Sequence, residues 1–404
     1  MEWKEVRLGD VCDLIAGFAF KAKDFGEFPT KVIKIGDIKP PFVDYVGQVG
    51  VDISNYDINR LSKYAVKYGD YVLAMTGATI GKVGKYISEN FSYINQRVLK
   101  FSPKQNVDAD YINYIICSNK FAKYVVNYVD SESAQPNISA PTISKFAFQI
   151  PKDKGNQRRI ASILSSLDRK IELNNKINAD LEEMAQAIFK NWFVDFEPFK
   201  DGEFVDSELG MIPEGWEVGT LTEIASYMNG LAMQKYPPEN NQDSLPVLKI
   251  KELGQGFCGT DSDRCSCNIK DECKIHNGDV IFSWSGTLLV DVWCGGDCGL
   301  NQHLFKVTSK DYPKWFYYYW TKHHLQEFIH IAKDKAVTMG HIKRGHLEEA
   351  MVAIPDNDSM EKAHELFEPI LSKMISLRLE NSRLSLLRDT LLPRLMSGEI
   401  EIPE

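Results

Sequence analysis

The strongest constraint on this chain is a long apolar stripe with coiled-coil spacing between Asn156 and Phe193. Steps of four and three residues alternate along it without a break, as in helices that pair with another helix. A weaker copy runs from Ala363 to Leu395. One stripe alone would suit a surface helix packed on its own domain. Two copies in one register, each spanning roughly 57 Å as a helix, favour pairing with each other.

Polar residues interrupt the stripe at equivalent places in the two copies. Asn178 and Asn381 occupy the same position of the repeated pattern. A buried asparagine lowers the stability of a coiled coil but excludes slipped pairings, so a fixed register is predicted. The residues expected to form this spacer seam are Leu164, Leu167, Ile171, Asn178, Leu181, Ile188, Met374, Asn381, Leu384 and Leu391.

The remainder of the chain repeats as well, so that each long helix follows its own globular domain. The repeated order of turns and short strands predicts two mixed α/β domains. Paired landmarks are Trp3 and Trp216, Gly17 and Gly230, Gly69-Asp70 and Gly278-Asp279, Asn95-Gln96 and Asn301-Gln302, and Ile150-Pro151 and Ile354-Pro355.

The predicted order is globule, helix, globule, helix. Parallel helices would bring both globules to one end, where they would collide, so an antiparallel pair is expected. The fold class is therefore α+β, with two α/β domains in tandem repeat joined by two long helices that form an antiparallel coiled coil. The predicted segments are an N-terminal domain at 1–151, a central helix at 152–197, a linker at 198–212, a C-terminal domain at 213–355 and a C-terminal helix at 356–404.

Each globule is also expected to contain a helix, at 108–129 in the first and at 313–332 in the second. The second helix carries six adjacent aromatic residues, 315–320. Such rings stack on unpaired bases in some proteins, but six in a row point all round a helix. Packing in the domain core is the favoured interpretation.

Composition and charge narrow the functional classes. The 404 residues are 44% hydrophobic and 25% charged, which is typical of a soluble globular protein. The net charge of -9 argues against a general basic coat for nucleic acid, so DNA binding would depend on local patches. No apolar run approaches membrane-spanning length, so a cytoplasmic protein without a membrane partner is expected.

Six of the eight cysteines lie between Cys258 and Cys298. Their spacings match no standard zinc pattern, although His303 is near in sequence. Reduced cysteines without a metal are expected, with a structural metal as the alternative.

Catalytic motifs in the sequence are short and isolated. Gly254-x-Gly256-x-x-Gly259 fits GxGxxG, and Pro40-Pro41-Phe42 fits the Pro-Pro-Phe of adenine methylases. Each match is a weak signal by itself, and the polar segment 260–264 lacks the apolar pattern of the helix that follows a dinucleotide-binding loop. The stretch Gly77 to Lys82 resembles a phosphate-binding loop, but it is one residue too short, and Val83 stands where Ser or Thr would bind magnesium. The chain is therefore not expected to be an enzyme.

The helical segments carry longer and more specific motifs. These are Gln157-Arg158-Arg159-Ile160-Ala161, Ile188-Phe189-Lys190, Trp192 to Phe199, Leu209 to Trp216 and Leu391 to Ile400. With them the whole chain resembles the DNA specificity subunits of type I restriction-modification systems, although its globules match only in outline. The second copy departs from the pattern because it lacks the Gln-Arg-Arg-Ile opening and has Arg388 where the first has Ala185.

The resemblance implies two target-recognition domains that read the two parts of a bipartite sequence in double-stranded DNA, the N-terminal domain reading the 5′ part. The helix pair would set the gap. Two modification (methyltransferase) subunits and restriction (translocase and endonuclease) subunits are the implied partners. S-adenosylmethionine, ATP and Mg are then expected on those partners, and no cofactor or metal on this chain.

Polar and basic loops of the two domains are the candidates for DNA contact. Small residues in the Thr76 to Lys82 loop would let backbone amides approach a phosphate, and Gln or Asn pairs bidentately with adenine. Each loop could equally be a solvated turn, and Gln96 or Gln302 could satisfy buried backbone groups. The candidates are Lys21, Lys23, Thr76, Thr79, Lys82, Gln96, Arg97, Gln135, Asn137, Ser139, Lys235, Ser285, Thr287, Gln302, His303, Lys335, Thr338, His341 and Lys343.

Two functions stay open at this point. The first is a non-catalytic reader of a split DNA site, because two similar domains related by an approximate twofold axis suit two half-sites on a duplex. The second is a coiled-coil scaffold that assembles protein partners without reading DNA.

Overall fold

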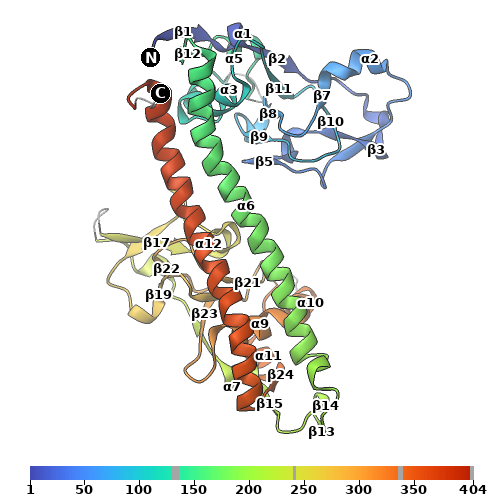
Figure 1. Ribbon diagram of the computed structural model, residues 1–404, viewed down its shortest axis with the longest axis vertical. Helices are drawn as coiled ribbons and strands as arrows, with labels where there is room; N and C mark the ends of the chain where they lie inside the picture. The colour runs from blue at the N-terminus through green and yellow to red at the C-terminus, as the bar shows by residue number, and fades with distance from the viewer. Residues whose placement is uncertain (130–135, 240–242, 335–339, 401–404) are drawn as a thin grey trace. The chain divides into compact units, whose positions relative to one another are not determined.

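The computed structural model describes residues 1–129, 136–239, 243–334 and 340–400. The chain divides into two compact units, one formed by 1–169 with 385–404 and the other by 170–384. The division falls within both long helices, α6 (Lys154–Phe193) and α12 (Asn357–Ser397). Figure 1 labels the elements along the chain.

The first unit is built from short strands in three sheets. Strand β1 pairs with β12, and the larger sheets have the orders β6-β3-β10-β7 and β2-β11-β8-β9-β5-β4. The strands are β1 (Trp3–Arg7), β2 (Cys12–Ala16), β3 (Phe25–Ile33), β4 (Ile38–Lys39), β5 (Phe42–Val43), β6 (Val49–Val51), β7 (Ala65–Val66), β8 (Tyr71–Ala74), β9 (Val83–Lys85), β10 (Ser92–Ile94), β11 (Val98–Pro103) and β12 (Ala147–Pro151). Its short helices are α1 (Leu8–Val11), η1 (Ala22–Asp24), η2 (Ile35–Asp37), α2 (Ile58–Leu61), η3 (Ser62–Tyr64), η4 (Gly77–Thr79), α3 (Ala109–Ile116), α4 (Asn119–Asn127) and α5 (Ala140–Ser144).

The second unit repeats the central part of this topology. The order β16-β23-β20-β21 matches β2-β11-β8-β9, and β18-β17-β22-β19 matches β6-β3-β10-β7. The strands are β13 (Phe204–Ser207), β14 (Gly210–Pro213), β15 (Glu217–Thr220), β16 (Ser226–Asn229), β17 (Ser244–Leu248), β18 (Arg264–Ser266), β19 (Lys274–Ile275), β20 (Val280–Ser283), β21 (Leu289–Val292), β22 (Cys298–Leu300), β23 (Leu304–Thr308) and β24 (Met351–Ile354). Its short helices are η5 (Glu197–Phe199), α7 (Leu221–Ile224), η6 (Met233–Lys235), α8 (Ile250–Gln255), η7 (Asp271–Cys273), α9 (Lys314–His323), α10 (Leu325–Asp334) and α11 (Arg344–Glu349).

The structure confirms the fold class, and the repeat extends to individual turns. Gly69 and Gly278 have φ angles of 90° and 93°, a conformation that only glycine adopts without strain. Each turn leads into a buried strand, β8 in the first unit and β20 in the second. The segment expected to be a linker contains a hairpin, in which β13 pairs with β14.

The expected helix at 108–129 was wrong in one respect, because it is two helices. Ser118 caps the N-terminus of α4, where its Oγ accepts a hydrogen bond from the Phe121 backbone N–H at 3.2 Å. Serine at this position satisfies an amide that lacks a partner within the helix, so it favours a new helix start over continuation. The expected helix at 313–332 is likewise divided into α9 and α10.

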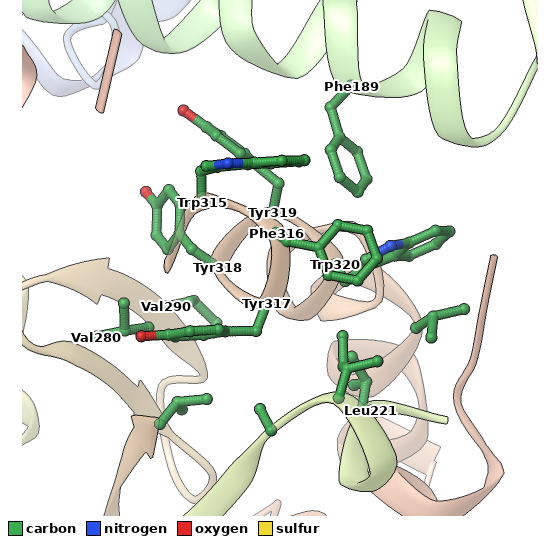
Figure 2. Packing of buried hydrophobic residues seen from close by; sticks show 14 of the residues in the cluster. Phe189, Leu221, Val280, Val290, Trp315, Phe316, Tyr317, Tyr318, Tyr319 and Trp320 are labelled. Carbon is green, nitrogen blue, oxygen red and sulfur yellow. The ribbon is translucent and has the colours of Figure 1, made fainter. Parts of the chain in front are cut away.

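The aromatic run 315–320 on α9 lies in the core of the second unit (Figure 2). Trp315 stacks on Phe367 of α12, with ring centroids 4.7 Å apart and planes 13° apart. Phe189 of α6 meets Trp320 edge to face at 5.1 Å. Burial of all six rings confirms the core interpretation and removes them as a stacking surface for bases.

The long helices run antiparallel where they meet in the second unit. In the second unit Asn174 donates from Nδ2 to Asn381 Oδ1 at 2.8 Å, and farther along α6 Phe189 meets Phe367. Residue numbers therefore rise on α6 as they fall on α12. In the first unit Asp168 of α6 pairs with Arg388 of α12.

Asn178 is not the partner of Asn381, although the two match in the repeat. Asn381 donates from Nδ2 to Asn175 Oδ1 at 2.8 Å. Asn178 is buried, and its Oδ1 has no hydrogen-bond partner among the described residues. In an antiparallel pair, equivalent positions of two copies face each other only at the centre of the pair, which is why Asn178 and Asn381 do not pair.

Candidate nucleic-acid interface

Three predicted loops of the first unit are joined by backbone hydrogen bonds. The Met75 N–H donates to the Arg97 carbonyl at 2.9 Å, and the Ile138 N–H donates to the Met75 carbonyl at 3.0 Å. Thr76 and Asn137 form an isolated antiparallel bridge. The loop after β8, the 95–97 turn and the segment before α5 therefore form one surface, defined here as the first loop cluster.

The second unit contains the same arrangement at the corresponding positions. The Trp284 N–H donates to the His303 carbonyl at 3.4 Å, and the Ile342 N–H donates to the Trp284 carbonyl at 3.0 Å. Ser285 and His341 form the isolated antiparallel bridge. This second loop cluster shows that the sequence repeat preserves which backbone groups pair, even where the side chains differ.

Two glycines bring a further loop to each cluster. A Cβ added to Gly17 would lie 2.2 Å from the Asn95 carbonyl oxygen, and one added to Gly230 would lie 2.3 Å from that of Asn301. These approaches are closer than any side chain tolerates. The candidate segments that follow, 20–23 and 234–235, therefore begin beside the Asn-Gln turns.

The side chains of the first loop cluster differ in how accessible they are. Lys82, Gln96, Arg97 and Asn137 are exposed. Ser139 is exposed as well, and its Oγ caps α5 by accepting from the Thr142 N–H at 3.2 Å.

Thr76 and Thr79 do not offer their hydroxyl groups to solvent. The Oγ1 atoms of both residues are covered, and neither has a hydrogen-bond partner among the described residues. In this conformation the loop therefore presents backbone groups and Lys82 rather than threonine hydroxyls.

Lys21 and Lys23 are exposed on either side of a fixed turn. The Tyr56 hydroxyl donates to the buried Asp24 carboxylate and accepts from the Lys21 N–H at 3.1 Å. Tyr56 thus holds the backbone of this turn and leaves both lysine side chains in solvent.

His303 is held in place at the second loop cluster. Its Nδ1 lies 3.1 Å from Oγ of the buried Ser285, and its Nε2 lies 3.3 Å from Nε2 of Gln302. Thr287, His341, Lys343 and Lys235 are exposed. Gln135, Lys335 and Thr338 lie outside the described residues.

An open cleft of about 620 Å³ adjoins the second cluster. Gln302 and His303 line it together with Gln234, which brings the 234–235 segment to the Asn-Gln turn. The charged residues that also line it, and that sequence reasoning missed, are Lys249, Lys251, Asp263 and Arg264.

The cleft residues form local ion pairs. Lys249 pairs with Asp263, and Lys251 with Asp261 at 2.6 Å. The hydrogen bond from Lys251 lowers the pKa of the Asp261 carboxyl. Pairing of β17 with β18 brings Arg264 opposite Pro246. Residues 249–263, which include α8, separate these strands in the sequence, so no local pattern indicated this side of the cleft.

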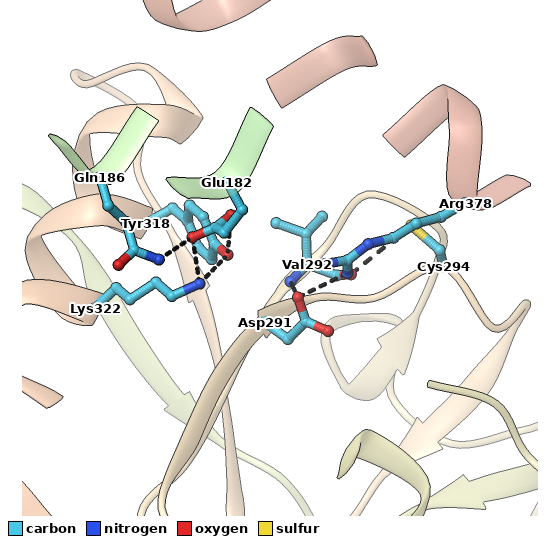
Figure 3. A network of polar contacts seen from close by, with 8 residues as sticks. All are labelled: Glu182, Gln186, Asp291, Val292, Cys294, Tyr318, Lys322 and Arg378. Atoms are coloured by element: carbon cyan, nitrogen blue, oxygen red, sulfur yellow. Dashed lines mark hydrogen bonds and ion pairs between the residues drawn. The ribbon is translucent and has the colours of Figure 1, made fainter. Parts of the chain in front are cut away.

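Polar contacts attach the second domain to both long helices within its unit (Figure 3). Glu182 of α6 accepts from Lys322 and from the Tyr318 hydroxyl, the latter at 3.5 Å. Arg378 of α12 donates from Nη1 to Asp291 Oδ1 at 2.7 Å and to the Val292 carbonyl at 3.0 Å. These contacts fix β21 and α9 on the helices.

The first unit has an equivalent attachment. The Tyr114 hydroxyl of α3 donates to Asp168 Oδ2 at 2.5 Å, and Arg388 donates to Asp168 Oδ1 at 2.8 Å. One carboxylate on α6 therefore joins the globule and α12.

Within the described parts of the chain, no group of three or more His, Cys, Asp or Glu residues is placed to hold a metal ion. Among the helices of those same ranges, none combines the length and apolar character needed to cross a bilayer.

Comparison with known proteins agrees with this arrangement. The family model for the type I restriction modification DNA specificity domain matches residues 1–183 and 213–381. The chain is 30% identical to the type I restriction enzyme MjaIX specificity subunit of Methanocaldococcus jannaschii, over 82% of this chain and 78% of that protein. It is 24% identical to the HindI specificity subunit of Haemophilus influenzae, over 99% of this chain and 100% of that protein.

Among solved structures, the type I restriction-modification S subunit from M. genitalium has the same fold. The TM-score is 0.53 at 13% identity, with 100% of this chain and 97% of that one covered. Family membership is established by the family model, whose two matched segments cover more than half of the chain, and by the relative that is 30% identical. The chain therefore belongs to the DNA specificity subunits of type I restriction-modification systems, the non-catalytic components that recognise DNA.

Proposed function

We propose that the chain reads a bipartite target in double-stranded DNA, with one half-site for each domain. The observation that carries this proposal is the duplicated loop cluster: the same backbone hydrogen bonds occur around Met75 and around Trp284. Membership in a family of DNA-recognising subunits indicates that the ligand is DNA. The presence of two equivalent loop clusters indicates two half-sites.

Within each cluster, basic side chains contact DNA phosphates. The side-chain amides of Asn and Gln, together with histidine, contact the bases. Exposed lysines add charge to the phosphate contacts despite the overall charge of -9. Side chains such as Asn137 and Gln302 have the paired donor and acceptor that adenine requires. The residues proposed to contact phosphates through their side chains are Lys21, Lys23, Lys82, Arg97, Ser139, Lys235, Ser285, Thr287, Lys335, Thr338 and Lys343. Thr76 and Thr79 would contribute backbone groups, because their hydroxyls are covered. The residues proposed to contact bases are Gln96, Gln135, Asn137, Gln302, His303 and His341.

The helix pair sets the gap between the half-sites. Asn381 accepts a hydrogen bond from Asn174 and donates one to Asn175, which supports a single register. A change in helix length would then change the gap without altering either half-site.

The partners are two modification subunits and restriction subunits, which carry S-adenosylmethionine, ATP and Mg for adenine methylation, translocation and cleavage. The chain itself directs these partner subunits to their target on DNA. This takes place in the cytoplasm. The domain boundaries and seam residues predicted from the sequence belong to the same proposal.

The proposal is tested by selecting bound DNA from a random library with the complex of this chain and its modification subunits. The selected DNA is expected to contain two enriched half-sites separated by a gap of fixed length. Binding without sequence preference would contradict the proposal and favour the scaffold function.

A further inference from the structure

Two cysteines that are distant in the sequence lie against each other in the second unit. Cys258 follows α8 in a loop, and Cys298 begins β22. Their side chains share a hydrogen bond, and both pack with the cluster that contains Trp293.

The backbone supports this contact independently. A Cβ added to Gly295 would lie 2.9 Å from the Gly256 carbonyl oxygen. The two segments therefore touch just before each cysteine, which limits how far the thiols can separate.

The two thiols have different environments. Cys258 is half-buried, whereas Cys298 is fully buried. The hydrogen bond from Cys298 lowers the pKa of the Cys258 thiol. The same hydrogen bond, followed by burial, raises the pKa of Cys298. Cys258 is thus the better nucleophile of the two thiols.

The other cysteines of this region lack this combination. Burial raises the pKa of Cys294 to about 11, and it also raises the pKa values of Cys265 and Cys273. A reactive thiol beside a second thiol that resolves it is the arrangement on which reversible cysteine oxidation depends.

We propose that Cys258 and Cys298 form a modification site at which a low-molecular-weight disulfide, such as oxidised glutathione, generates an intramolecular disulfide. The Cys258 thiolate attacks one sulfur of the oxidant, which releases one thiol and leaves a mixed disulfide on Cys258. Cys298 then loses its proton and attacks Cys258 Sγ, which releases the second thiol. Two protein thiols are oxidised and one small disulfide is reduced to two thiols.

The position of this pair links it to the cleft of the second domain. The loop that begins at Cys258 leads to Asp261 and Asp263, which pair with Lys251 and Lys249 of the cleft. Strand β22 leads from Cys298 directly to Gln302 and His303. A disulfide would therefore join the loop that carries Asp261 and Asp263, on one side of the cleft, to strand β22, which leads to Gln302 and His303 on the other side.

The experiment treats the full-length, reduced chain with oxidised glutathione, blocks the remaining thiols with iodoacetamide and maps the peptides without reduction. Loss of two alkylated thiols per chain is expected, with a peptide pair joined through Cys258 and Cys298. Dithiothreitol should restore both alkylation sites.

Matched variants make the result specific. Cys267→Ser removes another half-buried thiol of the same unit and should leave the cross-link intact, whereas Cys258→Ser should abolish it. Cys298→Ser should retain glutathione on Cys258, because the resolving thiol is missing. The inference is overturned if folded wild-type protein retains glutathione on Cys258, leaves Cys258 unmodified, or forms a different disulfide. DNA binding is not needed for this readout, so the result is independent of the proposed function.

Discussion

Arg388 donates to Asp168 at 2.8 Å, so the C-terminal helix contacts the central helix through the residue at which its repeat departs from the first copy. The equivalent position of the first helix, Ala185, is fully buried in the aromatic core of the second unit. Each copy of the helix packs against different neighbours at this position, which explains why one requires a small side chain and the other a charge.

Asp168→Ala is predicted to destabilise the first unit by about 1–3 kcal/mol, because it removes the acceptor of the Tyr114 hydroxyl and leaves Arg388 with Asp389 alone. Urea unfolding measures the loss. Lys170→Ala is the control, since its pair with Glu380 spans 3.6 Å and both side chains are more than 40% exposed; a change below about 0.5 kcal/mol is expected there. Equal effects of the two variants would contradict a special role for Asp168.

Asn381→Leu is predicted to destabilise the helix pair by about 1–3 kcal/mol, because the buried Asn174 loses one of the two acceptors of its Nδ2 group and keeps only Glu380. The double variant with Asn174→Leu should recover that loss, since two apolar residues can pack together in the seam. Thermal unfolding of the three proteins provides the comparison. A double variant less stable than Asn381→Leu would show that the asparagines do not act as a pair.

Gly17→Ala is predicted to destabilise the first domain by at least about 1–3 kcal/mol, the usual range for overpacking, because the added methyl would overlap the Asn95 carbonyl. Gly36→Ala is the matched control, since an added Cβ meets nothing within 4 Å there. Chemical denaturation distinguishes them. If the two variants have the same stability, the close approach of the Gly17 loop to the Asn-Gln turn is wrong.

Lys82→Ala is predicted to weaken DNA binding to all sequences alike, and to reduce by about one the slope of log affinity against log salt. Asn137→Ala should instead change the preferred base at one position of the first half-site. Binding titrations of the assembled complex at several salt concentrations separate these effects. Lys123→Ala, which removes an exposed lysine of α4 outside the loop cluster, should leave both quantities unchanged.

Sequence alone predicted the features that depend on local pattern. The period of the apolar stripe identified both long helices, and the Gly-Asp turns identified β8 and β20. The paired Asn-Gln motifs also marked turns that the structure brings to the loop clusters. These predictions are correct because each feature depends on residues that are neighbours along the chain.

Features that depend on distant pairing were missed or misread. The partner of Asn381 follows from antiparallel contact and not from the matching position of the repeat. One side of the cleft contains Lys249 and Arg264, and their positions depend on how β17 pairs with β18. The covering of the Thr76 and Thr79 hydroxyls depends on loop packing, which residue type alone does not reveal.

The most direct test of the account is the gap length in the DNA target after one heptad is inserted into both α6 and α12 in matched register. A heptad adds about 10.5 Å of helix, which corresponds to about three base pairs. Library selection with the assembled complex should return both half-sites unchanged, with a gap longer by that amount. An unchanged gap in a folded, DNA-binding variant would contradict the claim that the helix pair sets the distance between the two half-sites.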